Sequence, residues 1–345
     1  MKIIHTADIH LDSPLSQVKD PVKRRYELLQ ALANLSEYAD NNGCSAIIVA
    51  GDLFDDKFTT AQTISSVAQI INNSNAEWYI LRGNHGDATP YAKLAKQSQK
   101  ARFFGEDFTY YNIGNVTICG RELGANDAEQ YAKLQLDSSR FNIVVLHGDL
   151  DGDGYGLIDR KTLSVLPVSY VALGHRHAFS QYKFGRIAAC YSGALEPRGF
   201  DETAQTGFVE LDTETNVIRF VEQSLRSVTT VNVDVTGIAS DIELNTKIFQ
   251  AIQGESPKNY LNAVFSGALT EGVHLELIAR EALENRFFAL RIEDRTVTPY
   301  DVDGLMTEVS LRGEFVKLAM EIQDEQLRSD VLKTGLKALA GEEIL

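Results

Sequence analysis

The sequence predicts an α/β fold, more specifically an α+β sandwich of two β-sheets flanked by helices. Five short apolar runs, rich in β-branched or aromatic residues and bounded by glycine or polar residues, are typical of buried strands. They cover residues 2–7, 46–50, 78–81, 142–146 and 170–173. The segments between the first three runs carry apolar residues at helical spacing. We therefore expect those strands to be parallel and joined by right-handed crossovers.

The first two connecting segments predict helices over residues 21–41 and 60–72. The first follows Asp20, a typical N-cap, and begins with Pro21, because proline is favoured at the first helical position. Both segments carry apolar residues at helical spacing, which favours packing of one face against a sheet.

Antiparallel hairpins are indicated farther along the chain. The candidate strands are residues 182–184 with 187–191 and residues 207–211 with 217–221, and a further strand pair lies within 103–121. Turn-forming residues separate the members of each pair. We expect these hairpins to form the antiparallel flank of a second sheet.

A new alternation of strands and helices begins near residue 227. It comprises a strand at 228–235, a helix that opens with the capping box Ser240–Glu243, a strand at 260–265, a helix at 273–284 and a strand at 286–292. Two amphipathic helices are predicted beyond Asp303. The predicted division is therefore a main domain over 1–226, a small α/β domain over 227–298 and a C-terminal helical segment over 299–345.

Side chains that bind metals directly follow the five predicted strands. They are Asp8 and His10, Asp52, Asn84 and His85, His147, and finally His175 and His177. Ligands gather at the carboxyl ends of strands in such sheets, so these side chains could converge. Their mixture of oxygen and imidazole nitrogen suits two divalent ions such as Mn²⁺, Fe²⁺ or Zn²⁺. Because such a pair activates water and neutralises charge on phosphorus, phosphate ester hydrolysis is the reaction best explained.

Charge and composition are compatible with a cytoplasmic enzyme. A hydrophobic content of 44% supports a large core, and no segment has the length and apolarity of a membrane span. The N-terminus enters a strand without a signal-peptide pattern, and the three cysteines are expected to be reduced, packed thiols. The net charge of −15 argues against a polyanionic partner, but two bound divalent ions would add four positive charges at the site. The basic cluster 23–25 is expected on the surface.

The order of the motifs DIH, GDLFD, GNH, HG and GHRH resembles the calcineurin-like metallophosphoesterases. The stretches HTADIHLDSPL and YSGALEPRGFDET resemble the bacterial DNA-repair exonucleases of the SbcD and YhaO type. This resemblance implies an Mn²⁺-dependent DNA nuclease, an exonuclease that acts on DNA ends or single strands. It also implies a homodimer formed through residues 21–41 and 60–72, and a coiled-coil ATPase partner of the SbcC type. The region after residue 226 would help to present DNA, and the C-terminal helices could dock the partner.

The resemblance also implies a role for each motif residue. Asp8, His10 and His177 would hold one ion, Asn84, His147 and His175 the other, and Asp52 would bridge them. His85 would be the acid that protonates the leaving oxygen. The family usually has an acidic residue directly after this histidine, where this chain has Gly86 and then Asp87. If that acid orients His85, its displacement would either lower the reaction rate or let Asp87 take over from a shifted backbone, and in both cases the metal site would stay intact.

Several interpretations remain open. Arg176 and Arg198 are candidates for binding a DNA phosphate, although an ion pair of Arg198 with Glu196 or Asp201 explains that residue equally well. His5 is expected to pack or to support the metal ligands indirectly. The alternative functions are a phosphatase or phosphodiesterase for small nucleotides, and an architectural DNA-repair subunit with weak hydrolysis.

Overall fold

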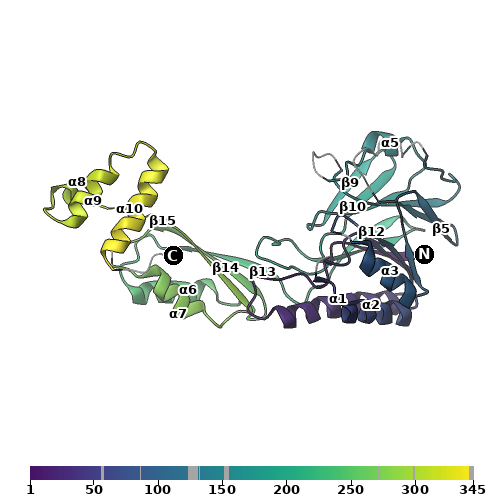
Figure 1. Cartoon of the computed structure of the whole chain (residues 1–345), viewed down its shortest axis with the longest axis horizontal. Coiled ribbons are helices and arrows are strands. Elements are labelled where there is room, and N and C mark those ends of the chain that lie inside the picture. Colours follow the sequence, from purple (N-terminus) through teal and green to yellow (C-terminus); the bar gives the residue numbers. More distant parts are fainter. Residues whose placement is uncertain are drawn as a thin grey trace. The chain divides into compact units, whose positions relative to one another are not determined.

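The computed structural model describes residues 1–55, 58–85, 87–122, 131, 133–150, 155–270, 272–297 and 300–341. The chain divides into two compact units (Figure 1). The first consists of Met1–Val228 with Lys258–Tyr260, and the second of Thr229–Pro257 with Leu261–Leu345. The predicted three-part division, with boundaries after residues 226 and 298, remains a prediction.

The first sheet of the first unit has six strands in the order β12-β11-β1-β2-β3-β4. These strands are β1 (Lys2–Thr6), β2 (Cys44–Ala50), β3 (Glu77–Leu81), β4 (Ala101–Phe103), β11 (Gly207–Asp212) and β12 (Val217–Glu222). Strands β1 to β4 are parallel, as the alternation of strands and helices predicted. The hairpin β11–β12 is antiparallel and pairs with β1, with Ile3 opposite Leu211.

The assignment of the hairpin over 207–221 to the second sheet was therefore wrong. Strand β2 pairs with only one edge of β1. The backbone groups of the other edge are therefore free to pair with β11. Val209 and Leu211 of β11 then point into the core between the two sheets. The sequence contains no local signal for this choice, because either sheet could accept an antiparallel hairpin.

The second sheet also has six strands, in the order β5-β6-β7-β8-β10-β9. They are β5 (Thr109–Ile113), β6 (Val116–Gly120), β7 (Phe141–His147), β8 (Tyr170–Gly174), β9 (Ser180–Phe184) and β10 (Ile187–Tyr191). The four central strands are parallel, and β5 and β9 are antiparallel edges, which confirms the two hairpins predicted for this sheet. Apolar side chains from both sheets, such as Ile48, Leu81, Val145 and Ala172, form one core between them.

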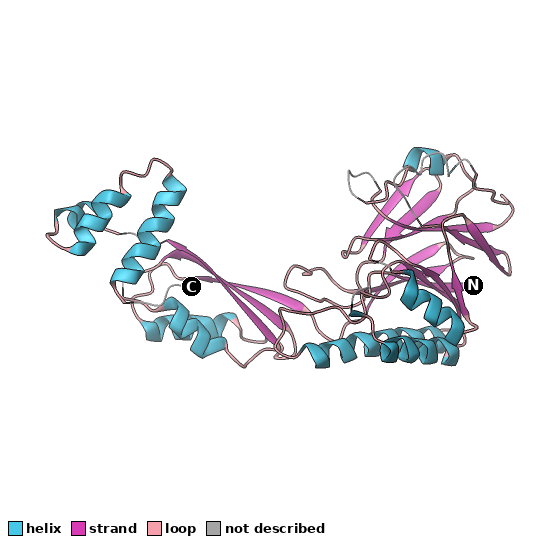
Figure 2. Cartoon of the chain, in the orientation of Figure 1, coloured by secondary structure: helices cyan, strands magenta, loops and turns pink. Residues whose placement is uncertain are grey.

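Helices cover the outer sides of this sandwich (Figures 1 and 2). The first sheet is flanked by α1 (Pro21–Asn41), α2 (Ala61–Asn73) and α3 (Ala88–Gln97), and the short α5 (Arg160–Ser164) lies beside the second. Asp20 caps α1 by accepting a hydrogen bond from the Lys23 amide, and Thr60 caps α2 in the same way. Both predicted helices are thus confirmed, together with the proline at the first position of α1.

The second unit is built on a three-stranded sheet of β13 (Val228–Asp234), β14 (Tyr260–Ala268) and β15 (Ala289–Val297). Helices α6 (Asp241–Ala251) and α7 (Leu275–Leu283) share its core, and Ser240 caps α6 as predicted. The final strand begins three residues later than predicted and extends to Val297. The C-terminal part forms three helices instead of two: α8 (Val302–Thr307), α9 (Leu311–Ala319) and α10 (Glu325–Leu339). Ser310 caps α9, which explains the additional break.

Two expectations from composition can be compared directly with the structure. All three cysteines lie in the described part of the chain, where they are buried free thiols, as expected. None of the described helices combines the length and apolar character that crossing a bilayer requires.

Candidate metal centre

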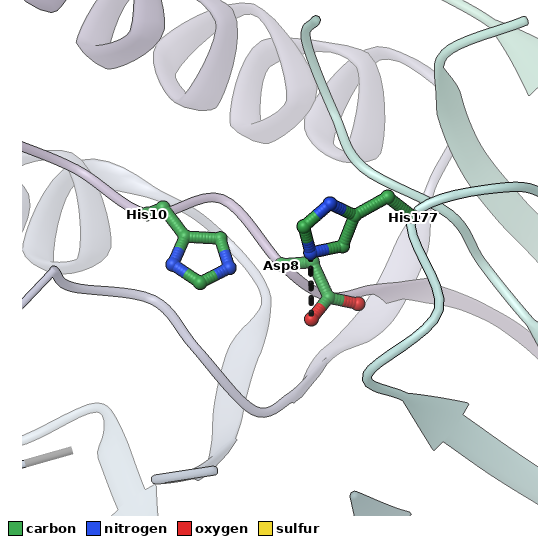
Figure 3. Close-up of side chains that lie close together, drawn as sticks. All are labelled: Asp8, His10 and His177. Atoms are coloured by element: carbon green, nitrogen blue, oxygen red, sulfur yellow. Dashed lines mark ion pairs between the residues drawn. The ribbon is translucent and has the colours of Figure 1, made fainter. Parts of the chain in front are cut away.

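Strand ends from both sheets bring the predicted metal-binding side chains together. Asp8, Asp52 and Asn84 follow β1, β2 and β3, His147 ends β7, and His175 and His177 follow β8. Potential ligand atoms form two sets, and within each set all of them lie within 4.8 Å of one another. The first set is Asp8 with His10 and His177, and the second is Asp8 with Asp52 and His147. Figure 3 shows the first set. Parallel strands in each sheet place these ends at the same edge, so the convergence predicted from the motifs is present in the fold.

His10 is the most informative member of the first set. It is buried, and neither of its ring nitrogens has a hydrogen-bond partner among the described residues. Burial, followed by the nearby charge of Arg198, lowers the pKa of His10 to about 2, so the ring is neutral and one nitrogen carries a lone pair. Its Nε2 lies 3.7 Å from Asp52 Oδ2. An unpaired buried nitrogen is costly, by about 1–3 kcal/mol, and a cation between the two atoms would relieve that cost.

His147 supplies a second argument for a cation. Its Nδ1 lies 2.9 Å from the carbonyl oxygen of Ala50, which can only accept, so Nδ1 carries the hydrogen. In the neutral ring the lone pair of Nε2 therefore faces Asn84 Oδ1 at 2.7 Å and Asp52 Oδ2 at 3.2 Å, both acceptors. Burial acts downward on the pKa of His147, but the contact with Asp52 outweighs it and raises that pKa. Three acceptors that converge in this way require a proton or a metal ion among them.

The two carboxylates are also difficult to bury without a positive charge nearby. Asp8 and Asp52 are each 1% exposed. Burial raises the pKa of Asp8 to about 6. Burial acts in the same direction on Asp52, but the hydrogen bond and charge of His147 overcome it and lower the pKa of Asp52 to about 2. The donor set thus fits a pair of divalent cations, since it combines two buried carboxylates with several imidazoles.

The backbone at the centre is held in an unfavourable conformation. Asp8, His10, Asp52 and His175 have φ values of 53°, 47°, 53° and 103°. Residues other than glycine rarely adopt the left-handed region, and each such position costs on the order of 1–3 kcal/mol. Strain of this kind concentrates at functional sites because the surrounding structure must impose it. Here the amide of Asp8 donates to Gly51 O and the amide of Asp52 donates to Arg82 O, which ties the loops to neighbouring strands.

Gly83, in the GNH motif, packs against a proposed ligand. It has a φ of +92°, and a Cβ atom at this position would lie 2.2 Å from Asp52 Oδ1. We expect Gly83→Ala to displace Asp52 and to weaken the binding of divalent metal ions, probed with Mn²⁺, by roughly 10-fold or more, which corresponds to a loss of about 1.4 kcal/mol or more. Isothermal titration calorimetry of the metal-free protein measures this effect.

Gly114→Ala is the matched control for Gly83→Ala. Gly114 also has a positive φ, of +50°, but open space surrounds its Cβ position. Both variants therefore introduce backbone strain, and only the first crowds Asp52. Equal Mn²⁺ affinities of the two variants would contradict the role assigned to Gly83.

His85, the predicted acid, lies beside the two sets of ligands. Its amide donates to Asp52 Oδ1 at 3.0 Å, and its ring centroid lies 5.0 Å from that of His10. The residue is exposed. Gly86, which replaces the usual acidic residue, lies outside the described residues. Asp87 caps α3 by accepting hydrogen bonds from the amide and hydroxyl of Thr89.

Both arginines proposed to bind phosphate contact carboxylates of this chain. Arg176 donates from Nε to Asp149 Oδ1 at 2.9 Å, and Arg198 donates from Nη2 to Glu202 Oε1 at 2.8 Å. The ion pair predicted for Arg198 is thus present, but with Glu202 instead of Glu196 or Asp201. The spacing of four residues between Arg198 and Glu202 is a possible signal, but it is weak outside a helix.

The contact that sequence reasoning missed is between Glu202 and His177. Glu202 Oε1 lies 2.8 Å from His177 Nδ1, and Glu202 is 9% exposed. Burial would raise the pKa of Glu202, but its bond to His177 and the charge of Arg198 lower that pKa to about 2. Glu196 instead pairs with Arg24 at 2.6 Å. Because Arg24 is fully buried, the expectation that cluster 23–25 lies on the surface is wrong for this residue.

A model of the calcineurin-like phosphoesterase family matches residues 1–179, and the chain belongs to this family. It is therefore a phosphoester hydrolase, with a fold that binds two divalent metal ions and with candidate ligands present. The predicted resemblance to this family, and within it to the SbcD and YhaO type, is confirmed.

Two curated relatives and one solved structure illustrate the similarity. The chain is 25% identical over 351 residues to the uncharacterized metallophosphoesterase YhaO of Bacillus subtilis (strain 168), covering 88% of this chain and 84% of that protein. It is 23% identical over 257 residues to the SbcD component of the SbcCD nuclease of Staphylococcus epidermidis, covering 63% and 67%. A structure of an archaeal phosphodiesterase aligns with a TM-score of 0.39 and 17% identity, covering 65% and 100%.

Proposed function

We propose that this chain is an Mn²⁺-dependent DNA nuclease, an exonuclease that hydrolyses phosphodiester bonds at DNA ends or in single strands. The observation that carries the proposal is the convergence of buried carboxylates and imidazoles at the strand ends, including the unpaired ring of His10, with an exposed histidine beside them. The similarity of the chain to the SbcD component of the SbcCD nuclease supports DNA as the substrate.

The proposed ligands of the first ion are the first set of side chains, and those of the second ion are His147 with its neighbours Asn84 and His175. Asp8, His10 and His177 would hold one ion, Asn84, His147 and His175 the second, and Asp52 would lie between them. When bound, the two ions would lower the pKa of a water molecule and neutralise the charge that develops on the phosphate. The protein holds the donors in place through its strands, and the Ala50 carbonyl keeps the Nε2 lone pair of His147 directed inward.

His85 is the proposed general acid. Its amide donates to Asp52 Oδ1, and its exposed ring lies beside His10, where it would protonate the departing oxygen of a phosphodiester. We expect His85→Ala to lower Mn²⁺-dependent release of nucleotides from linear DNA by roughly 10²- to 10⁴-fold, the usual contribution of a positioned acid. Mn²⁺ binding should be retained, because His85 is not a proposed ligand.

The control for His85→Ala is His274→Ala. His274 belongs to the second unit and pairs with Asp241 at 2.9 Å, so its loss removes a histidine without touching the centre. Equal low activity of the wild type and His85→Ala would remove the nuclease proposal. Hydrolysis of small phosphate esters with no release from DNA would favour the nucleotide phosphatase instead, and full metal loading without any hydrolysis would favour the architectural role.

Assembly belongs to the same proposal. A homodimer through α1 and α2 is supported by the exposed Val22 and Tyr26, which are 72% and 66% accessible on α1. A coiled-coil ATPase of the SbcC type could dock on α9 and α10, where Leu311, Leu318 and Leu327 are exposed. We assign residues 227–298 to the presentation of DNA, because a phosphatase for small esters does not need an additional domain.

A further inference from the structure

Three side chains form a chain of contacts behind the first set of proposed ligands. Arg198 Nη2 and His177 Nδ1 both lie 2.8 Å from Glu202 Oε1. The Arg198 amide donates to the other carboxylate oxygen, Oε2, at 2.8 Å. Both oxygens of Glu202 are therefore engaged, and the carboxylate is held in one orientation.

The orientation of Glu202 determines which nitrogen of His177 carries the hydrogen. Nδ1 faces both Glu202 Oε1, at 2.8 Å, and the guanidinium Nη2 of Arg198, at 3.1 Å. The carboxylate is the closer of the two and can only accept, and Nη2 itself donates to that oxygen at 2.8 Å, so the hydrogen of neutral His177 lies on Nδ1. The lone pair then lies on Nε2, which is 4.0 Å from Asp8 Oδ1 (Figure 3). In metal sites, the hydrogen bond made by one ring nitrogen sets the tautomer and direction of the other.

We propose that Glu202 is a positioning residue that, held by Arg198, presents the Nε2 lone pair of His177 to the metal ion shared with Asp8 and His10. This inference rests on the metal site of the proposed function. Arg198, which sequence reasoning offered as a phosphate ligand, then has a different role: its backbone and guanidinium fix Glu202.

The neighbouring histidine provides an internal comparison. Arg176 is bonded to Asp149, and Asp149 Oδ2 lies near His175 Nε2, but at 3.7 Å instead of 2.8 Å. The same order of arginine, carboxylate and histidine therefore occurs twice, with a hydrogen bond to the histidine only at Glu202. We expect the loss of Glu202 to affect metal binding more strongly than the loss of Asp149.

The test uses the whole chain, stripped of metal, and Mn²⁺ alone as the probe. Glu202→Ala should weaken one of the two Mn²⁺ sites by about 10- to 100-fold, the usual effect of removing a partner of a ligating histidine. Glu202→Gln keeps an acceptor oxygen and should have a smaller effect. Asp201→Ala is the matched control, because it removes an exposed carboxylate one residue away.

A second measurement does not depend on metal or on activity. In the metal-free protein, nitrogen NMR of labelled histidines reports which ring nitrogen carries the hydrogen, and His177→Ala assigns the signal. The wild type, Asp201→Ala and Glu202→Gln should show the hydrogen on Nδ1. Glu202→Ala should show it partly or wholly on Nε2.

The outcomes separate this inference from the proposed function. Wild-type affinity at both Mn²⁺ sites in Glu202→Ala, or an unchanged tautomer of His177, would overturn it. Equal weakening of both sites in Glu202→Gln would also overturn it, because Glu202 is assigned to one ion. If the affinities and tautomers change as expected but no variant hydrolyses DNA, only the choice of substrate fails.

Discussion

Asp52→Asn is expected to lower DNA hydrolysis by roughly 10⁴-fold or more, or about 5 kcal/mol of transition-state stabilisation. The carboxylate lies 3.7 Å from His10 Nε2 and 3.2 Å from His147 Nε2, so it reaches both sets of proposed ligands. Its pKa of about 2 means that it is ionised at neutral pH. Asparagine keeps the shape of the side chain and removes the charge that both ions would share.

Two measurements check this expectation. Elemental analysis after gel filtration gives the number of Mn²⁺ ions retained, and the release of nucleotides from linear DNA gives the rate. Asp55→Asn is the matched control, since Asp55 lies three residues farther along the same loop and is only half-buried. An Asp52→Asn protein that retains two ions and hydrolyses DNA within about 10-fold of the wild type would refute the central role of Asp52.

The metal-free protein is expected to lose stability as the pH falls from about 6.5 to about 3 because of His5, which burial holds at a pKa of about 3. His5 is completely buried; its Nε2 lies 3.2 Å from the Leu173 carbonyl and must donate, so Nδ1 accepts from the Tyr170 hydroxyl at 2.8 Å. The unfolded chain binds a proton near pH 6.5 and the folded chain does not. Protonation therefore favours unfolding throughout this range.

The size of the effect follows from the pKa values of His5 in the unfolded and folded chain. The ordinary value of 6.5 and the folded value of about 3 correspond to a loss of up to about 5 kcal/mol, at about 1.4 kcal/mol for each pKa unit. Urea unfolding in EDTA between pH 7 and pH 3 measures it. His5→Gln cannot titrate, so the difference between the wild-type and variant stabilities should shrink as the pH falls. Parallel pH profiles of the two proteins would show that His5 does not contribute.

Short-range patterns predicted much of this fold. The caps at Asp20 and Ser240, the proline that begins α1 and the apolar runs of the central strands all depend on neighbours in the sequence. The proposed metal ligands also follow strands directly, so their convergence could be expected from strand direction alone. The sequence also predicted that His5 packs or supports the metal ligands indirectly, and the residue is buried in contact with Tyr170 and the Leu173 carbonyl.

The features that sequence reasoning missed depend on distant contacts. The hairpin β11–β12 joins the first sheet because β1 leaves an edge open, which no turn or cap in the hairpin reveals. Arg24 is buried because Glu196, far along the chain, reaches it. Glu202 is likewise separated from His177 by 25 positions, and only the folded loop brings the two together.

The left-handed backbone at Asp8, His10, Asp52 and His175 also bears on whether folding and metal binding are separate events. In a zinc finger the ion organises a disordered chain, so binding and folding are one event. Here hydrogen bonds within the protein hold this backbone, because the Asp8 amide donates to Gly51 O and the Asp52 amide donates to Arg82 O. The fold holds the donor side chains in place, and a bound cation would relieve the repulsion between the buried carboxylates Asp8 and Asp52. A chelator should therefore remove the metal ions without unfolding the protein, and the metal-free protein should bind metal again without refolding.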